Sequence, residues 1–172
     1  SDRILKRMHR SYSKDDFLIL AKKIRQILPG VGISTDIIVG FPGETDKEFK
    51  ETLEVMKEVK FDSAYNFIYS PRKGTKAAEY EDYISENDKK KRLQDVINLQ
   101  KLHTLERNKS LIGTFQEVII EKESKMSPTQ WAGRTDSNKW VIFDKQHLKI
   151  GDSVLIKIKK AVGLSLKGTL QL

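Results

Sequence analysis

The stretch Thr35-Asp36-Ile37-Ile38-Val39-Gly40-Phe41-Pro42-Gly43-Glu44-Thr45 decides the fold that the first part of this sequence predicts. Its uninterrupted Ile-Ile-Val run is typical of a parallel strand that is buried on both faces. The glycines and the proline that follow end this strand. Thr45 and Glu48 have the spacing of a capping box, which predicts that a helix begins there.

The loop between this strand and this helix is a candidate ligand site. In an α/β fold, the loop after the carboxyl end of a parallel strand faces the ligand, and the next helix presents its positive end there. Gly40 and Gly43 allow the backbone to approach a ligand closely. The spacing does not match the phosphate-binding loop G-x-x-x-x-G-K-[ST]. An ordinary strand-to-helix turn explains the same residues equally well.

Helices are predicted before this stretch. Capping residues indicate that one begins at Ser1 or Asp2 and another after Ser13. The second helix has an apolar stripe that is expected to be core, formed by Phe17, Leu20, Ala21, Ile24, Ile27 and Leu28.

Further elements alternate after the stretch. The helix that begins at Thr45 is expected to reach Val59, and residues 64–69 have the composition of a strand. A long helix is expected from about residue 85 to residue 108, and its Lys89-Lys90-Lys91-Arg92 run is typical of a solvated face. This alternation of helices and strands predicts an α/β domain over residues 1–108.

Residues 109–172 have a different pattern, which predicts a second domain. Short β stretches separated by Gly, Pro, Asp and Asn cover residues 115–121, 130–134, 139–143, 153–158 and 164–170. Five short strands in so few residues predict a small all-β, five-stranded barrel. This part contains eleven Lys and Arg residues against six Asp and Glu, a net charge of +5 out of +8 for the chain. Such a charge favours a polyanionic partner.

The composition excludes several classes of function. None of the 172 residues is a cysteine, so disulfides, a thiol nucleophile and an iron–sulfur cluster held by this chain alone are excluded. His9, His103 and His147 are too scattered for a local metal site, and no metal site is predicted. The sequence contains no apolar run long enough for a bilayer and no apolar signal at Ser1. We therefore expect a cytoplasmic protein that contacts no membrane.

Four motifs follow one another along the chain: Leu5-Lys6-Arg7-Met8-His9-Arg10, the stretch from Thr35 to Thr45, the segment from Tyr69 to Ala78, and Gly133-Arg134-Thr135-Asp136. In this order they resemble the radical SAM methylthiotransferases, and the resemblance covers nearly the whole chain. The resemblance implies that residues 1–108 are the C-terminal part of an incomplete, TIM-like parallel α/β barrel that binds S-adenosylmethionine. It implies that residues 109–172 are an OB-like RNA-binding barrel, the TRAM domain.

The resemblance also implies cofactors that this chain cannot complete. Members of the family bind two 4Fe-4S clusters through cysteines, and these cysteines are absent here. In the family, a reduced cluster cleaves S-adenosylmethionine and the resulting radical abstracts hydrogen from C2 of a modified adenosine. A second cluster supplies sulfur, and a further S-adenosylmethionine supplies the methyl group. No catalytic residue is therefore expected in this chain, which is not expected to be active alone.

Seven residues correspond to the cofactor-binding positions of the family. Arg10 matches the arginine that pairs with the methionyl carboxylate in the family. A guanidinium suits this role because it binds a carboxylate through two parallel donors. Asp36 matches a position that accepts hydrogen bonds from ribose hydroxyls or the ligand ammonium. The remaining positions resemble the strand edges that contact adenine: Ile38, Gly40, Phe67, Ile68 and Tyr69. From the residues alone, Asp36 is equally typical of a cap or a turn, and the strand-edge residues are more often core.

RNA contacts are expected mainly in the second domain. The resemblance implies that Arg72, with Gly74 and Thr75, lies in a loop on the substrate side, although a turn explains Gly74 as well. In the small barrel, cations and an aromatic plane are suited to phosphates and unpaired bases: Arg134, Lys139, Trp140, Lys157 and Lys159. Trp131 or Trp140 is equally acceptable as a core residue.

The expected function follows from the resemblance. It implies a transferase that adds a methylthio group to C2 of N(6)-isopentenyladenosine beside the anticodon. The expected partners are the tRNA anticodon arm, S-adenosylmethionine and an electron donor, and the protein is expected to be monomeric. Relatives that act on threonylcarbamoyladenosine in tRNA or on a ribosomal-protein aspartate remain alternatives, as does a non-catalytic RNA-binding module. Asp36 and the Tyr69-Ser70-Pro71-Arg72 sequence favour the prenyladenosine type.

Overall fold

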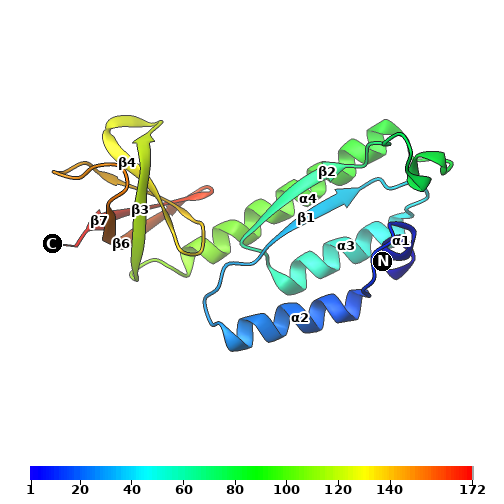
Figure 1. Cartoon of the computed structure of the whole chain (residues 1–172), viewed down its shortest axis with the longest axis horizontal. Coiled ribbons are helices and arrows are strands. Elements are labelled where there is room, and N and C mark those ends of the chain that lie inside the picture. Colours follow the sequence, from blue (N-terminus) through cyan, green and yellow to red (C-terminus); the bar gives the residue numbers. More distant parts are fainter. Residues whose placement is uncertain (172) are drawn as a thin grey trace. The chain divides into compact units, whose positions relative to one another are not determined.

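The computed structural model describes residues 1–171, which form two compact units (Figure 1). The first unit covers Ser1–His103 and the second begins at Thr104. This division lies within a helix, slightly before the boundary predicted at residue 108. In the described part of the chain, no helix is both long and apolar enough to cross a membrane.

The first unit alternates helices and strands, as predicted. Its elements are α1 (Asp2–Arg7), α2 (Lys14–Ile27), β1 (Ser34–Val39), α3 (Asp46–Val59), β2 (Ser63–Ile68), the short 3₁₀ helix η1 (Lys76–Glu79) and α4 (Glu86–Lys109). β1 and β2 pair in parallel, with Asp36 opposite Tyr65 and Ile38 opposite Phe67. Parallel pairing requires a crossover, and α3 supplies it (Figure 1).

The predicted helix starts are confirmed by the hydrogen bonds at the helix ends. The Ser1 hydroxyl accepts from the Ile4 amide at the start of α1. Ser13 with Asp16, and Thr45 with Glu48, form complete capping boxes at the starts of α2 and α3. Each box satisfies amides that have no partner within the helix, which explains why both helices begin where the sequence places them.

The core of this unit lies on one face of the two strands. Ile37 and Val39 of β1 are buried with residues of α2, α3 and α4 and of the connection between α3 and β2: Ala21, Phe49, Met56, Val59, Phe61 and Val96. The prediction that β1 is buried on both faces is wrong, because Asp36 and Ile38 point to the other face and are exposed. All three packed helices lie on the face of Ile37.

Two further expectations about side-chain burial are wrong in part. In α2, Phe17 and Ala21 pack into the core, whereas Leu20, Ile27 and Leu28 are more than half exposed. In α4, Lys90 and Lys91 are exposed as predicted, but Lys89 and Arg92 are buried. The basic run is therefore not a uniform solvated face, since Lys89 pairs with Asp82 and Glu86, and Arg92 pairs with Glu44 and Asp46.

The second unit is a closed barrel, and it confirms the five predicted strands. These are β3 (Phe115–Ser124), β4 (Ser127–Thr135), β5 (Trp140–Asp144), β6 (Ser153–Val162) and β7 (Ser165–Leu170). They close in the order β3-β4-β5-β7-β6, and β6 pairs back with β3. The strands pair antiparallel except for β5 and β7. Alternate residues fill the interior: Val118, Ile120, Trp131, Val141, Phe143, Ile156, Ile158 and Leu166. Closure removes the strand edges.

Candidate functional site

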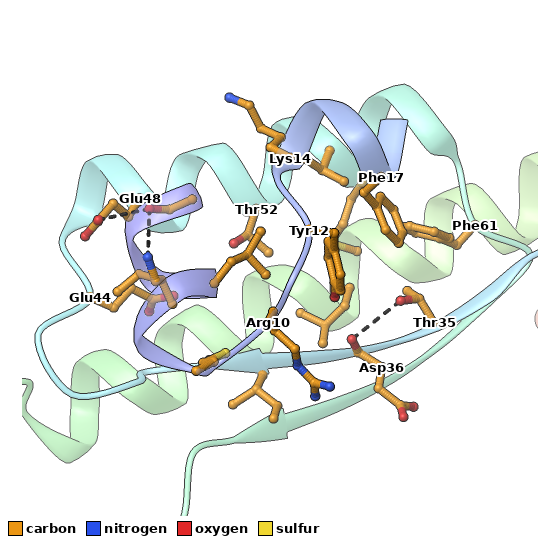
Figure 2. A pocket seen from close by; sticks show the side chains of 18 residues that line it. Arg10, Tyr12, Lys14, Phe17, Thr35, Asp36, Glu44, Glu48, Thr52 and Phe61 are labelled. Atoms are coloured by element: carbon orange, nitrogen blue, oxygen red, sulfur yellow. Dashed lines mark hydrogen bonds between the residues drawn. The ribbon is translucent and has the colours of Figure 1, made fainter. Parts of the chain in front are cut away.

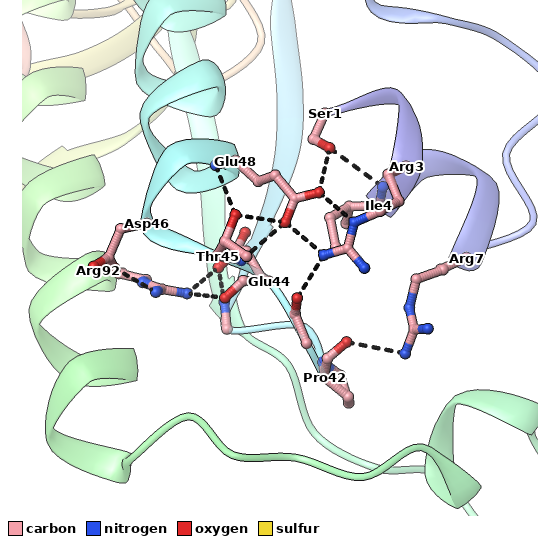
Figure 3. Close-up of polar contacts among 12 residues, drawn as sticks. Ser1, Arg3, Ile4, Arg7, Pro42, Glu44, Thr45, Asp46, Glu48 and Arg92 are labelled. Atoms are coloured by element: carbon pink, nitrogen blue, oxygen red, sulfur yellow. Dashed lines mark hydrogen bonds and ion pairs between the residues drawn. The ribbon is translucent and has the colours of Figure 1, made fainter.

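The loop after β1 is held by a buried carboxylate. Gly40 has a φ of 69° and donates its amide hydrogen to Glu44 Oε2 at 2.8 Å. Arg92 of α4 donates to the same oxygen at 2.8 Å and to the Glu44 carbonyl at 3.1 Å. Burial raises the pKa of the Glu44 carboxyl above its ordinary value, while the hydrogen bonds from Gly40 and Arg92 act in the opposite direction. Figure 3 shows the contact between Glu44 and Arg92.

The start of α4 covers this loop. Arg92 also donates to Asp46 at 2.7 Å. The aliphatic part of Lys89 lies so close to Gly40 that a Cβ there would be 2.7 Å from Lys89 Cγ, while the Lys89 ammonium pairs with Asp82 and Glu86. Glycine is therefore required at position 40 by its positive φ and by the close approach of this side chain. Together these contacts fix the backbone at the carboxyl end of β1.

A second network joins α1 to the start of α3. Arg3 donates two hydrogen bonds of 2.6 Å to the two carboxylate oxygens of Glu48, and a third to the Gly43 carbonyl (Figure 3). The Ser1 hydroxyl donates to Glu48 Oε1 at 3.0 Å. The hydrogen bonds from Arg3 hold the pKa of the Glu48 carboxyl well below its ordinary value. α1 is thereby fixed against the loop after β1.

We expect the stability of the first unit to fall with acidification through Glu48. A carboxyl whose pKa is lowered by folding stabilises the folded state above its unfolded pKa, about 4.5, and loses this contribution as the pH falls below that value. In Glu48→Gln, the far-UV urea midpoint should be lower at neutral pH and should change less between about pH 3 and about pH 6, a range that brackets that unfolded pKa.

Glu51→Gln serves as the matched control for this measurement. Glu51 is also a carboxylate of α3, and it pairs with Lys14 at 3.2 Å. Its replacement should leave the wild-type pH dependence. An unchanged profile in Glu48→Gln would contradict the role given to the Arg3–Glu48 contact.

A cavity of about 180 Å³ lies beside β1 and brings together Arg10 and Asp36. His9 has a left-handed φ of 56°, which ends α1 and turns the chain toward β1. Figure 2 shows the Arg10 and Asp36 side chains extending to the same side of this strand. Thr35, Asp36, Ile37 and Ile38 all line the cavity, and consecutive residues of a strand point to opposite faces. The cavity therefore extends around the edge of β1.

The exposed face of the sheet continues from this cavity. Ile38 is 37% exposed and Phe67, its partner on β2, is 51% exposed. Ile68 lies on the other face and packs against the core, so its side chain is directed away from Ile38 and Phe67. Tyr69 is partly buried, and its ring packs edge-on against Phe41 at 5.0 Å.

Two aromatic residues of this site were not singled out by sequence reasoning. Tyr12 lines the cavity with Arg10. Tyr65 is 64% exposed and lies opposite Asp36 in the parallel register. The signal for Tyr65 was present, because it precedes Phe67 by two residues and so shares its face.

The segment after β2 forms a turn on the surface. Arg72 and Thr75 are exposed, and the Thr75 hydroxyl donates to the Arg72 carbonyl at 2.8 Å. Gly74 has a φ of 84° and open space where a side chain would lie. The turn explains Gly74 and Thr75, and the Arg72 side chain remains accessible.

The outer face of the barrel carries a cation–aromatic group whose residues come from β3, β4 and β5. Arg134 and Trp140 are paired residues of β4 and β5. The Trp140 ring lies 4.3 Å from the Arg134 guanidinium and 4.2 Å from the Lys122 ammonium, measured to the ring centroid. Lys139 is partly buried next to Trp140. Trp131, in contrast, is 9% exposed and belongs to the barrel core.

Lys157 and Lys159 lie on β6, at a different place on the barrel. Lys157 is opposite Phe115 of β3 and opposite Thr169 of β7. Lys159 is exposed. The barrel strands therefore separate the predicted RNA-binding residues into two groups, one around Trp140 and one around Lys157.

Residues 1–171, which the structure describes, contain no cluster of side chains suited to a metal ion. The sequence contains no cysteine, and the described residues include no group of three His, Asp or Glu side chains arranged to hold a metal ion. The chain therefore does not fit an iron–sulfur cluster, whereas Arg10, Asp36 and Ile38 offer a cation, an anion and an apolar surface around one cavity.

Comparison with known proteins assigns both units. The sequence model of the radical SAM superfamily matches residues 1–56, and that of the TRAM domain matches residues 109–170. The tRNA-2-methylthio-N(6)-dimethylallyladenosine synthase of Carboxydothermus hydrogenoformans is 44% identical over 170 residues, which are 99% of this chain and 39% of that protein.

Proteins of the same name from two other bacteria give similar values. That of Christiangramia forsetii is 44% identical over 98% of this chain and 35% of its own length, and that of Clostridium novyi is 45% identical over 98% and 37%. The chain thus spans less than two fifths of the length of these curated relatives and aligns with their C-terminal portion. Over the part that it spans, the chain belongs to the radical SAM methylthiotransferase family.

Proposed function

We propose that this chain is the cofactor-facing and RNA-binding part of a tRNA methylthiotransferase that modifies C2 of N(6)-isopentenyladenosine beside the anticodon. The observation that carries the proposal is 44% identity, along 99% of the chain and across both units, to a relative named for this product. The partners that we propose are the tRNA anticodon arm, S-adenosylmethionine and an electron donor. The prenyladenosine substrate is favoured over the two alternatives because the relatives compared above carry its name.

The residues beside β1 are suited to S-adenosylmethionine. The Arg10 guanidinium can grip the methionyl carboxylate with two parallel donors, and the Asp36 carboxylate can accept from the ligand ammonium or ribose hydroxyls. Ile38 and Phe67 offer an exposed apolar surface for adenine, next to the backbone of Gly40 and Tyr69. At Ile68, the inward side chain leaves only the backbone available for such a contact. When bound, S-adenosylmethionine supplies the methyl group and the deoxyadenosyl group of the reaction.

The contribution of this chain is to bind and to orient. Glu44 and Arg92 fix the loop after β1, and Arg3 and Glu48 fix α1, so the cavity that contains Arg10 has two anchored walls. A fixed site lowers the entropy lost on binding. We further propose that β1 and β2 are the later strands of an incomplete, TIM-like barrel, since their uncovered face exposes the large apolar side chains of Ile38, Tyr65 and Phe67.

A chimera tests this proposal in a complete enzyme. This chain replaces the matching C-terminal portion of the Carboxydothermus relative, and the chimera is expressed in cells that lack their own methylthiotransferase. We expect methylthiolated isopentenyladenosine in hydrolysed tRNA, measured by mass spectrometry. Arg10→Gln should weaken S-adenosylmethionine binding by the purified chimera about tenfold, because it removes a charge-assisted contact.

Lys22→Gln is the matched control, because Lys22 is an exposed cation of the same unit that lies outside the cavity. It should leave both readouts at the level of the unmodified chimera. Methylthiolated threonylcarbamoyladenosine in place of the expected nucleoside would contradict the substrate. A chimera that binds RNA but whose affinity for S-adenosylmethionine is the same with and without Arg10 would favour the alternative of a non-catalytic RNA-binding module.

A further inference from the structure

Phe115 is an exposed aromatic residue on the outer face of the barrel. Its side chain is 47% exposed at the start of β3, although phenylalanine is usually buried. The Lys157 ammonium lies 5.4 Å from the centroid of the ring, and Lys157 and Phe115 are paired residues of β6 and β3. An exposed ring beside an ammonium is the arrangement that proteins use to stack an unpaired base and hold its phosphate.

This pair is separate from the group around Trp140. Trp140 is on β5 and is paired with β4 and β7, whereas Phe115 is on β3 and is paired with β6. Ile119 of β3 is paired with Arg134 of β4. It lies four residues after Phe115, which is about 13 Å at the usual rise of a strand. Trp140 already has cations 4.2 and 4.3 Å from its ring centroid. The cation beside the Phe115 ring is Lys157, and its ammonium lies farther from the ring centroid than either cation of the Trp140 group.

The surroundings of Phe115 favour a polyanion over a protein partner. Leu155 and Ile119 are exposed on the same outer face and extend the apolar surface. Lys159 and Lys160 follow Lys157 on β6 and are exposed. Glu117, a carboxylate on this face, accepts a hydrogen bond from Ser153 at 2.6 Å. The net charge of +5 on residues 109–172 is complementary to phosphate.

We propose that Phe115 and Lys157 form a second RNA contact on the barrel, distinct from the Trp140 group, in which an unpaired nucleobase stacks on the Phe115 ring and its phosphate pairs with Lys157. The inference rests on the proposed RNA-binding function and adds the requirement for single-stranded RNA. A paired base has no accessible face, so the contact selects loops over duplexes.

The test uses the whole chain and an RNA hairpin whose unpaired loop contains 2-aminopurine. We expect wild-type protein to bind the hairpin and to change the fluorescence of the probe. Phe115→Leu keeps an apolar side chain but removes the ring, so it should weaken hairpin binding about tenfold and abolish the fluorescence change. Phe115→Tyr should restore both, and binding to a duplex of the same stem should be equal in all variants.

Tyr83→Leu is the matched control, because it removes a ring that is 81% exposed in the first unit; it should bind like the wild type. Thermal unfolding of each variant separates loss of contact from loss of fold. Equal hairpin binding by folded Phe115→Leu and wild-type protein would overturn the second contact while leaving RNA binding intact. Absence of hairpin binding by the wild type would overturn both the contact and the proposed RNA-binding function. Self-association that Phe115→Leu abolishes, with unchanged RNA affinity, would assign the surface to protein and overturn the inference.

Discussion

Replacement of Arg92 by Met is expected to destabilise the first unit by about 3 kcal/mol, because it leaves the Glu44 carboxylate buried without its charged partner. Met retains much of the apolar length that packs beside Phe49, so the loss is electrostatic more than steric. The exposed contact to Asp46 adds little. An energy of this size changes the folding equilibrium more than a hundredfold.

The two units can be followed separately in this experiment. Both tryptophans, Trp131 and Trp140, belong to the barrel, whereas α1, α2, α3 and most of α4 belong to the first unit. Far-UV circular dichroism therefore reports mainly on the first unit, and tryptophan fluorescence on the second. Arg92→Met should lower the urea midpoint of the far-UV signal and leave the fluorescence midpoint unchanged.

Two variants define what would contradict this prediction. Lys91→Met changes the exposed neighbour of Arg92 on α4 and should change stability by less than about 0.5 kcal/mol. Glu44→Gln in the Arg92→Met background removes the unpaired charge and should recover part of the loss. If the double variant were as unstable as Arg92→Met, the buried charge would not be the cause.

Replacement of Gly133 by Ala is expected to destabilise the barrel by roughly 3 kcal/mol, since there is no space for a methyl group. An added Cβ would lie 2.4 Å from the Ile119 carbonyl oxygen and 2.6 Å from Val118 Cγ1. The first of these atoms belongs to the backbone of the adjacent strand, so relief requires β3 and β4 to separate. The midpoint of the tryptophan fluorescence transition should fall, while the far-UV midpoint of the first unit should not.

Gly168 offers an independent repeat of this test, because its added Cβ would lie 2.4 Å from Ile156 Cγ2 and 2.6 Å from the Lys157 carbonyl. Thr169→Ala changes the exposed neighbour on the same strand and should have little effect. If Gly133→Ala were as stable as the wild type, the barrel would have accommodated the methyl group, and the close packing of the two backbones would not be the constraint proposed here.

Features that depend on neighbouring residues were predicted from the sequence better than features that depend on distant ones. The helix starts were predictable because Ser13 and Thr45 cap their helices through residues three positions away. The barrel strands were predictable from alternation of apolar and polar residues, since the period of two follows from local geometry. Arg92 was misread because its partner Glu44 is 48 residues away, and no local pattern shows that they meet.

The sequence by itself determined the order of elements, the capped helices, the five barrel strands and the absence of cysteine ligands, because each depends on residues that are neighbours or on composition. Only the tertiary structure decided which face of β1 is covered, which cations of α4 are buried, that Arg10 and Asp36 share one cavity, and that Phe115 lies exposed beside Lys157. These features depend on contacts between segments that are distant in the chain. An Ile-Ile-Val run or a Lys-rich helix has the same local pattern whether or not such a contact forms.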